Sequence, residues 1–121
     1  MYDHIGVKVK DIDASVRFYT AALAPLGHVL CSRDEASASF GPEGAPALYL
    51  QADDSPRGPG AHIALRAADR SAVDRFYREG LSAGGRDNGK PGVRADYAPT
   101  YYAAFLHDPD GNNLEAVCLK P

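Results

Sequence analysis

The pattern that opens this chain recurs 58 positions later, which is the separation of His4 from His62. At this one offset eight or more residues are identical and in the same order, among them His4 and His62, Ile5 and Ile63, Asp11 and Asp69, Ala14 and Ala72, Phe18 and Phe76, Tyr19 and Tyr77, Leu23 and Leu81, and Gly27 and Gly85. Identities at a fixed offset indicate a duplicated structural unit. We therefore expect two equivalent units, with the functional site where they face each other.

The length of 121 residues is typical of one domain. We expect that domain to contain a first unit over about 1–52 and a second over about 61–121. Residues 53–60 combine Pro and Gly with small polar residues, which is typical of a linker.

Composition argues against several classes of partner. The net charge is −3 and the Lys and Arg residues are scattered, whereas a nucleic-acid partner calls for a basic face. No apolar run approaches the roughly 20 residues needed to cross a bilayer, and the N-terminus has no signal-peptide pattern. We therefore expect a cytoplasmic protein with no membrane partner, in which Cys31 and Cys118 are unpaired thiols.

Hydrophobic periodicity assigns the first unit the order βαβββ. Residues 2–9 alternate between apolar and polar, as a strand with one buried face does. Asp11 is expected to cap a helix over about 12–23. The three further strands are expected over 28–33, 36–40 and 47–51.

The second unit follows the same order with a longer loop inside it. A strand over 61–67 leads to a helix over about 70–83 capped by Asp69, and residues 86–99, rich in Gly and Pro, are expected to form a loop. Strands are expected over 101–106 and 113–119. The predicted fold is therefore α+β, with two βαβββ units forming a cup-shaped curved mixed sheet and the helices on its convex side.

Alternation along the strands predicts which side chains line the concave face. His4, Gly6 and Lys8 are expected there, as are the equivalent residues His62, Ala64 and Arg66. In the last strand Leu114, Ala116 and Cys118 form the apolar face, so Glu115 is expected to point inward.

Two imidazoles and one carboxylate in a concave site suit a divalent metal with open coordination positions. Two alternatives need no metal. The histidines could be hydrogen-bonded wall residues, and Arg66 could pair with Glu115. Lys8 and Arg66 could bind a substrate anion or be exposed strand-end charges.

Several motifs resemble the vicinal oxygen chelate superfamily, the group of glyoxalases, bleomycin-resistance proteins and extradiol dioxygenases. They are Asp-His-Ile-Gly at 3–6, Asp-x-x-x-Ser-x-x-Phe-Tyr at 11–19, His-Ile-Ala at 62–64 and Asp-Pro-Asp-Gly-Asn-Asn-Leu-Glu at 108–115. The resemblance implies a cup that holds a divalent metal (Mn, Ni, Zn, Fe or Mg). It places metal ligands at His4, His62 and Glu115, and implies a homodimer.

The fourth strand departs from the pattern of glyoxalase I, which has a Glu there. Aligning the turns places Leu48 or Tyr49 at this position, and Gln51 is the nearest oxygen donor on the Tyr49 face. The chain thus resembles the short glyoxalase-like members with three ligands.

The resemblance implies a metal-dependent enzyme of the lyase, isomerase or thiol-transfer type, with the metal acting as a Lewis acid on a small oxygen-chelating substrate. Expected catalytic residues are Glu115, Tyr49 and Tyr102, and expected substrate-binding residues are Arg66, Arg94, Tyr97 and Tyr101. His28 and His107 are expected to have no catalytic role. The alternative is a metal-free protein that binds or sequesters a small molecule, as in the bleomycin-resistance branch.

Overall fold

The computed structural model describes residues 2–55 and 60–121, so part of the expected linker, residues 56–59, lies outside the described residues. The first unit contains β1 (Ile5–Val9), α1 (Ile12–Leu23), a 3-10 turn η1 (Ala24–Leu26), β2 (Val29–Arg33), β3 (Ser37–Gly41) and β4 (Leu48–Ala52). The second contains β5 (His62–Arg66), α2 (Arg70–Ser82), β6 (Arg86–Val93), β7 (Tyr102–His107) and β8 (Asn113–Cys118). The predicted α+β fold with two βαβββ units is confirmed.

Each unit forms its own four-stranded mixed sheet. The strand orders are β1-β4-β3-β2 and β5-β8-β7-β6, and in each sheet the first strand pairs in parallel with the last. Over residues 2–55 and 60–121 no strand of one sheet pairs with a strand of the other. The two sheets therefore remain separate and do not close into one barrel.

The helices begin where the sequence predicted because aspartates cap them. Asp11 accepts a hydrogen bond from the backbone N–H of Ala14 at 3.1 Å, and Asp69 accepts one from Ala72 at 2.7 Å. These bonds satisfy N–H groups that the first helical turn leaves without partners. The same capping chemistry at equivalent positions reflects the duplication.

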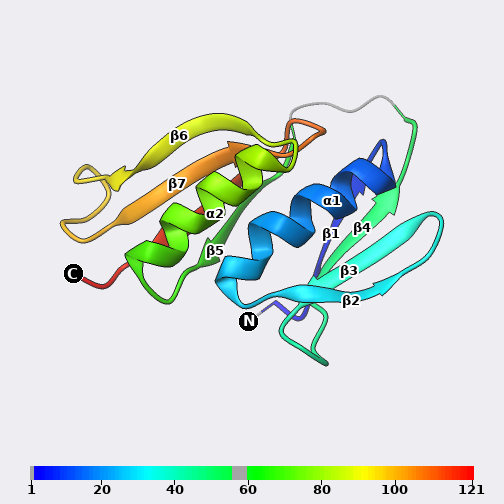
Figure 1. Ribbon diagram of the computed structural model, residues 1–121, viewed down its shortest axis with the longest axis horizontal. Helices are drawn as coiled ribbons and strands as arrows, with labels where there is room; N and C mark the ends of the chain where they lie inside the picture. Colours follow the sequence, from blue (N-terminus) through cyan, green and yellow to red (C-terminus); the bar gives the residue numbers. More distant parts are fainter. Residues whose placement is uncertain (1, 56–59) are drawn as a thin grey trace.

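The two units meet along their helices, which lie next to each other in Figure 1. Gly80 of α2 lies at this contact. A Cβ atom added there would lie 2.3 Å from Leu106 Cδ1 and 3.4 Å from both Ala22 Cβ and Phe18 Cε1. Only a residue without a side chain allows the helices to pack this closely against each other and against β7.

A buried aspartate in the turn between β7 and β8 also joins the units. Tyr19 of α1 donates its hydroxyl to Asp108 Oδ2 at 2.7 Å, and Asp108 accepts three more hydrogen bonds from Asp110 and Asn112. Burial, together with the nearby Asp108 carboxyl, raises the pKa of Tyr19 well above its ordinary value. Asp110 in turn accepts a bond from the Lys10 backbone N–H at 2.9 Å. The turn preceding β8 is thereby anchored to the first unit.

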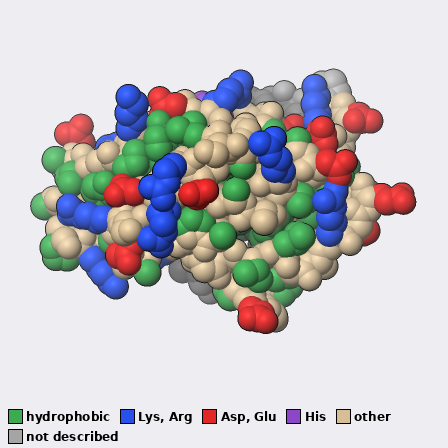
Figure 2. Space-filling view, viewed as in Figure 1, with side chains coloured by type: hydrophobic (Ala, Val, Ile, Leu, Met, Phe, Trp, Pro, Cys, Tyr) green, Lys and Arg blue, Asp and Glu red, His purple; other side chains and the backbone are tan. Residues whose placement is uncertain are grey.

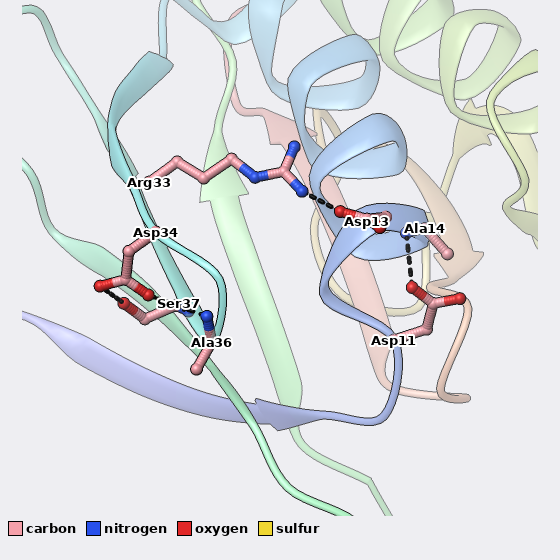
Figure 3. A network of polar contacts seen from close by, with 7 residues as sticks. All are labelled: Asp11, Asp13, Ala14, Arg33, Asp34, Ala36 and Ser37. Carbon is pink, nitrogen blue, oxygen red and sulfur yellow. Dashed lines mark hydrogen bonds and ion pairs between the residues drawn. The ribbon is translucent and has the colours of Figure 1, made fainter.

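On the first unit, Arg33 at the end of β2 pairs with Asp13 in the first turn of α1 (Figure 3). Next to it, Asp34 accepts hydrogen bonds from the backbone N–H groups of Ala36 and Ser37, which shapes the β2–β3 turn. These bonds lower the pKa of the Asp34 carboxyl. The ion pair thus holds this hairpin against α1.

On the face of the molecule that Figure 2 shows, basic and acidic side chains are interspersed, and the basic ones do not form a separate patch.

The prediction of a loop over residues 86–99 is wrong for the first half of that segment, because residues 86–93 form strand β6. It pairs antiparallel with β7 and its register shifts on both sides of Gly89. Gly89 has a φ of 149°, which favours glycine and lets the strand bulge. A strand containing glycines and a proline lacks the apolar alternation that sequence reasoning depends on.

The cysteines and the helices have two further properties that bear on the location of the protein. Cys31 on β2 and Cys118 on β8 are free thiols, as expected. Neither α1 nor α2 is long and apolar enough to span a membrane.

Candidate functional site

Glu115 projects from the face of the second sheet opposite α2. Its neighbours Leu114 and Ala116 belong to the core beneath the helix, and side chains alternate along a strand. In the register of the sheet, Glu115 lies between Ala64 of β5 and Phe105 of β7. It is only 3% exposed, which is rarely tolerated for a carboxyl group without polar partners.

Both oxygens of Glu115 have such partners. His62 Nε2 lies 3.0 Å from Oε2, and the Tyr101 hydroxyl donates to Oε1 at 2.5 Å. The hydrogen bond to Glu115 is the main cause, and burial the second, that raises the pKa of Tyr101 to about 12. The suggested Arg66–Glu115 pair is wrong, since His62 and Tyr101 occupy the carboxylate and Arg66 lies exposed on β5.

The first sheet repeats this layout with a different residue at the central position. Gly6 of β1 lies opposite Tyr49 of β4, as Ala64 lies opposite Glu115 in the second sheet. Tyr49 is therefore the structural counterpart of Glu115. Its ring contacts the edge of the His4 ring, with 5.4 Å between centroids.

The register also shows where the three candidate residues of the fourth strand lie. Leu48 is buried in the core and cannot reach the face that carries His4. Gln51 lies on the Tyr49 face, opposite Lys8, one step farther along the strand. Lys8 itself pairs with Asp53 at 3.3 Å and is largely exposed.

The structure brings two of the three predicted metal ligands together. His62 and Glu115 are in contact, whereas His4 bonds to Asp3 and contacts Tyr49. Across the described parts of a single chain, no group of three or more His, Cys, Asp or Glu residues is placed to hold a metal ion. In an octahedral site with bonds of about 2.1 Å, neighbouring donor atoms lie about 3 Å apart. The 3.0 Å spacing of His62 Nε2 and Glu115 Oε2 fits this requirement.

Three of the predicted substrate-binding residues lie around this pair. Tyr97 packs edge-on against Tyr101, with 5.1 Å between ring centroids. The Arg94 guanidinium carbon lies 5.4 Å from the centroid of Phe105, and the same ring lies 6.5 Å from the His62 ring.

A family model described as Glyoxalase/Bleomycin resistance protein/Dioxygenase superfamily matches residues 2–116. The chain belongs to this superfamily. A solved glyoxalase/bleomycin resistance protein from Albidiferax ferrireducens T118 is 27% identical, with a TM-score of 0.82 and 98% of both chains covered. No curated protein matches the chain.

Two more distant members of the superfamily share the fold. A family enzyme from Burkholderia phytofirmans PsJN is 17% identical, with a TM-score of 0.75 and 98% of both chains covered. A glyoxalase I mutant from Zea mays is 24% identical, with a TM-score of 0.68; the match covers 96% of this chain and 43% of the maize chain.

Within this superfamily fold, Tyr102 does not join the pair of His62 and Glu115. Its hydroxyl donates to Asp74 of α2 at 2.6 Å, and the Arg70 guanidinium lies 4.9 Å from its ring centroid. Tyr102 therefore faces the helix. The catalytic role expected for it is not supported, because alternation along β7 turns it to the side opposite Phe105 and Glu115.

Three further residues lie on the same face as Glu115: Phe105 and Asn113, which sequence reasoning did not single out, and His107, which it placed outside the site. The Phe105 side chain lies between those of His62 and Arg94. In the sheet register, Asn113 lies between His62 of β5 and His107 of β7. The Asn113 Oδ1 and His107 Nδ1 atoms are buried without a hydrogen-bond partner. Counting alternate residues back from Glu115 would have found Asn113, but the other two depend on the pairing of β7 with β8.

A pocket of about 530 Å³ lies elsewhere, on the first unit. It is lined by Val29, Leu30, Cys31, Ser32, Ser39, Glu43, Gly44 and Pro46. None of the predicted site residues lines it, so its size does not make it the better candidate. The predicted site residues that contact one another lie instead around Glu115.

Proposed function

We propose that this chain is a divalent-metal-dependent glyoxalase-like enzyme that acts on a small oxygen-chelating substrate, by a lyase, isomerase or thiol-transfer reaction. The observation that carries the proposal is the pairing of His62 with the buried Glu115. A carboxylate is costly to bury, so a fold that keeps one beside an imidazole, on a face not needed for its core, points to a function.

The residues of the second sheet would divide the work among them. His62 and Glu115 would hold the ion, and Tyr101 keeps Glu115 oriented through the bond to its other oxygen. Phe105 forms an apolar wall beside His62. A bound divalent ion supplies Lewis acidity to the oxygens of a substrate and stabilises negative charge on them.

We propose that His4 is the third ligand and that a homodimer supplies it. His4 lies with Tyr49 on the first sheet and makes no contact with Glu115 in its own chain. Pairing the first unit of one copy with the second unit of another would bring the two half-sites together. Tyr49, which is 40% exposed, would then present its hydroxyl to the substrate.

Metal content tests this proposal. Purified wild type, His62→Ala and Glu115→Ala would each be exposed to manganese, nickel, zinc, iron or magnesium, desalted, and analysed by elemental mass spectrometry. We expect near-stoichiometric metal in the wild type and a loss of binding in both variants, since removing a ligand leaves too few donors to hold the ion.

His28→Ala is the matched control. His28 is half-buried, burial lowers its pKa, and it lies outside the site. This variant should bind metal like the wild type. A wild-type protein that binds none of the five metals would overturn the proposal.

One observation favours a second candidate, a metal-free small-molecule binding protein of the bleomycin-resistance type. His62 and Tyr101 already satisfy Glu115, and aromatic rings surround the pair. Such a protein would bind its ligand with the same affinity after a chelator has removed any metal, and the His62→Ala variant would still bind the ligand. A cytoplasmic location, in keeping with the two free thiols, is proposed for either function.

A further inference from the structure

We infer that Arg94 is an anion-binding residue that selects substrates carrying a carboxylate next to their metal-chelating oxygens. The inference rests on the proposed function, which locates the site at His62 and Glu115, but it concerns the guanidinium of Arg94. It assigns the substrate class, small organic carboxylates, to a guanidinium that the fold holds beside His62 and Glu115.

The side chain of Arg94 is held in place by backbone oxygens rather than by an acid. Its Nη2 donates to the carbonyl of Lys90 at 2.6 Å and its Nη1 to that of Gly92 at 3.0 Å. Both carbonyls belong to the bulged strand β6, so the guanidinium is tied back to the strand that precedes it. No ion pair joins Arg94 to an acidic residue in the part of the chain that the structure describes.

Two glycines make room for the guanidinium. A Cβ atom at Gly92 would lie 3.1 Å from Arg94 Nη1, and one at Gly89 would lie 3.3 Å from Nη2 and 2.9 Å from Phe105 Cδ2. Side chains at these positions would force the guanidinium or the Phe105 ring to shift. The glycines that hid strand β6 from sequence reasoning are thus the residues that shape this cradle.

The held guanidinium still has donors to offer. Arginine has five N–H groups in a planar fork, and only two of them are used by the backbone carbonyls. Arg94 is half-buried, which leaves part of the group open to a ligand while weakening the competition from water. A fork of this kind matches the two oxygens of a carboxylate better than a single donor does.

The position of Arg94 relates it to the proposed metal ligands. The Phe105 ring contacts both the Arg94 guanidinium and the His62 ring, so all three lie on one side of the sheet. A small ligand lying over Phe105 could therefore contact Arg94 at one end and the His62–Glu115 pair at the other. The planar rings of Phe105 and Tyr101 suit a flat organic acid.

Calorimetric titration of metal-free protein with two carboxylates, benzoate and pyruvate, tests the inference. Benzamide and pyruvamide serve as neutral counterparts of the same shape. We expect the wild type to bind the acids and to bind the amides about ten- to a hundredfold more weakly, the range for hydrogen bonds to a charged group. Arg94→Gln should lose the same factor for the acids alone.

Two variants separate position from charge. Arg94→Lys keeps the charge but not the fork, and Gly92→Ala keeps Arg94 but shifts its guanidinium by a few tenths of an ångström, so both should bind the acids more weakly than the wild type. Gly92 does not have a positive φ, so alanine is compatible with its backbone. Arg78→Gln, on the exposed side of α2 where Arg78 contacts Glu79, should bind like the wild type.

The outcomes also distinguish this inference from the proposed function. Equal binding of acids and amides, undiminished binding by Arg94→Gln, or no saturable binding by the wild type would overturn the role of Arg94, even if the protein binds metal. Acid binding that depends on Arg94 in a wild type that binds no metal would uphold it and reject only the metal-dependent enzyme. Thermal unfolding of each variant would verify that it is folded.

Discussion

The two sheets present the same layout of residues on the face opposite the helices but different chemistry. In the second, a buried carboxylate at position 115 contacts His62 and Tyr101. In the first, the equivalent position holds Tyr49, whose partner His4 has a side chain that is 60% exposed. The duplicated units have thus diverged: the second carries an acid–imidazole pair, and the first offers one imidazole and a phenol.

The turns that precede β4 and β8 differ in the same direction. In the second unit, buried Asp108 accepts four hydrogen bonds, one of them from Tyr19 across the interface between units. The corresponding turn of the first unit contains the exposed residues Pro42 and Glu43. The turn that leads into β8, the strand that carries Glu115, is therefore the one held by buried hydrogen bonds.

The largest effect on stability is expected from this turn. Asp108→Ala would leave the Tyr19 hydroxyl and neighbouring donors buried without an acceptor, so the free energy of unfolding should fall by about 3 kcal/mol or more. Urea unfolding would measure it. Glu43→Ala is the matched change in the first unit and should stay within about 0.5 kcal/mol of the wild type. Equal losses would show that the two turns do not differ as described.

A smaller difference is expected between two tyrosines. Tyr101→Phe removes a hydrogen bond to a buried carboxylate and should cost about 1–3 kcal/mol in metal-free protein. Tyr49→Phe removes a hydroxyl for which the described residues provide no hydrogen-bond partner, so its cost should stay below about 0.5 kcal/mol. Urea unfolding compares the two, and a Tyr49→Phe variant as unstable as Tyr101→Phe would contradict the asymmetry.

The sequence was sufficient for features that depend on local pattern. The bounds of α1, the caps Asp11 and Asp69, and the placement of His62 and Glu115 on one face follow from side-chain chemistry and strand alternation. The duplication also identified equivalent positions, since residues that match at a fixed offset occupy the same place in both units. These features need no knowledge of how distant segments pack.

Features set by long-range pairing were not predictable. Strand β6 forms because β7 offers it a partner, even though its glycines and Pro91 lack a strand pattern. Alternation alone turns Tyr101 and Tyr102 to opposite faces, but which of them meets Glu115 depends on how β7 pairs with β8. The separation of His4 from Glu115 depends on how the two units pack along their helices, which no local pattern encodes.

In the proposed homodimer, the unlike half-sites of two copies form one metal site. Mixing His4→Ala with Glu115→Ala chains by joint unfolding and refolding would test this arrangement, with metal binding followed by elemental analysis of the refolded dimers. Neither variant alone should bind metal. Together they should regain about one quarter of the wild-type sites, since half of randomly formed dimers are mixed and each mixed dimer has one intact site. If the wild type binds metal but the mixture recovers none, the site lies within a single chain and the proposed arrangement is wrong.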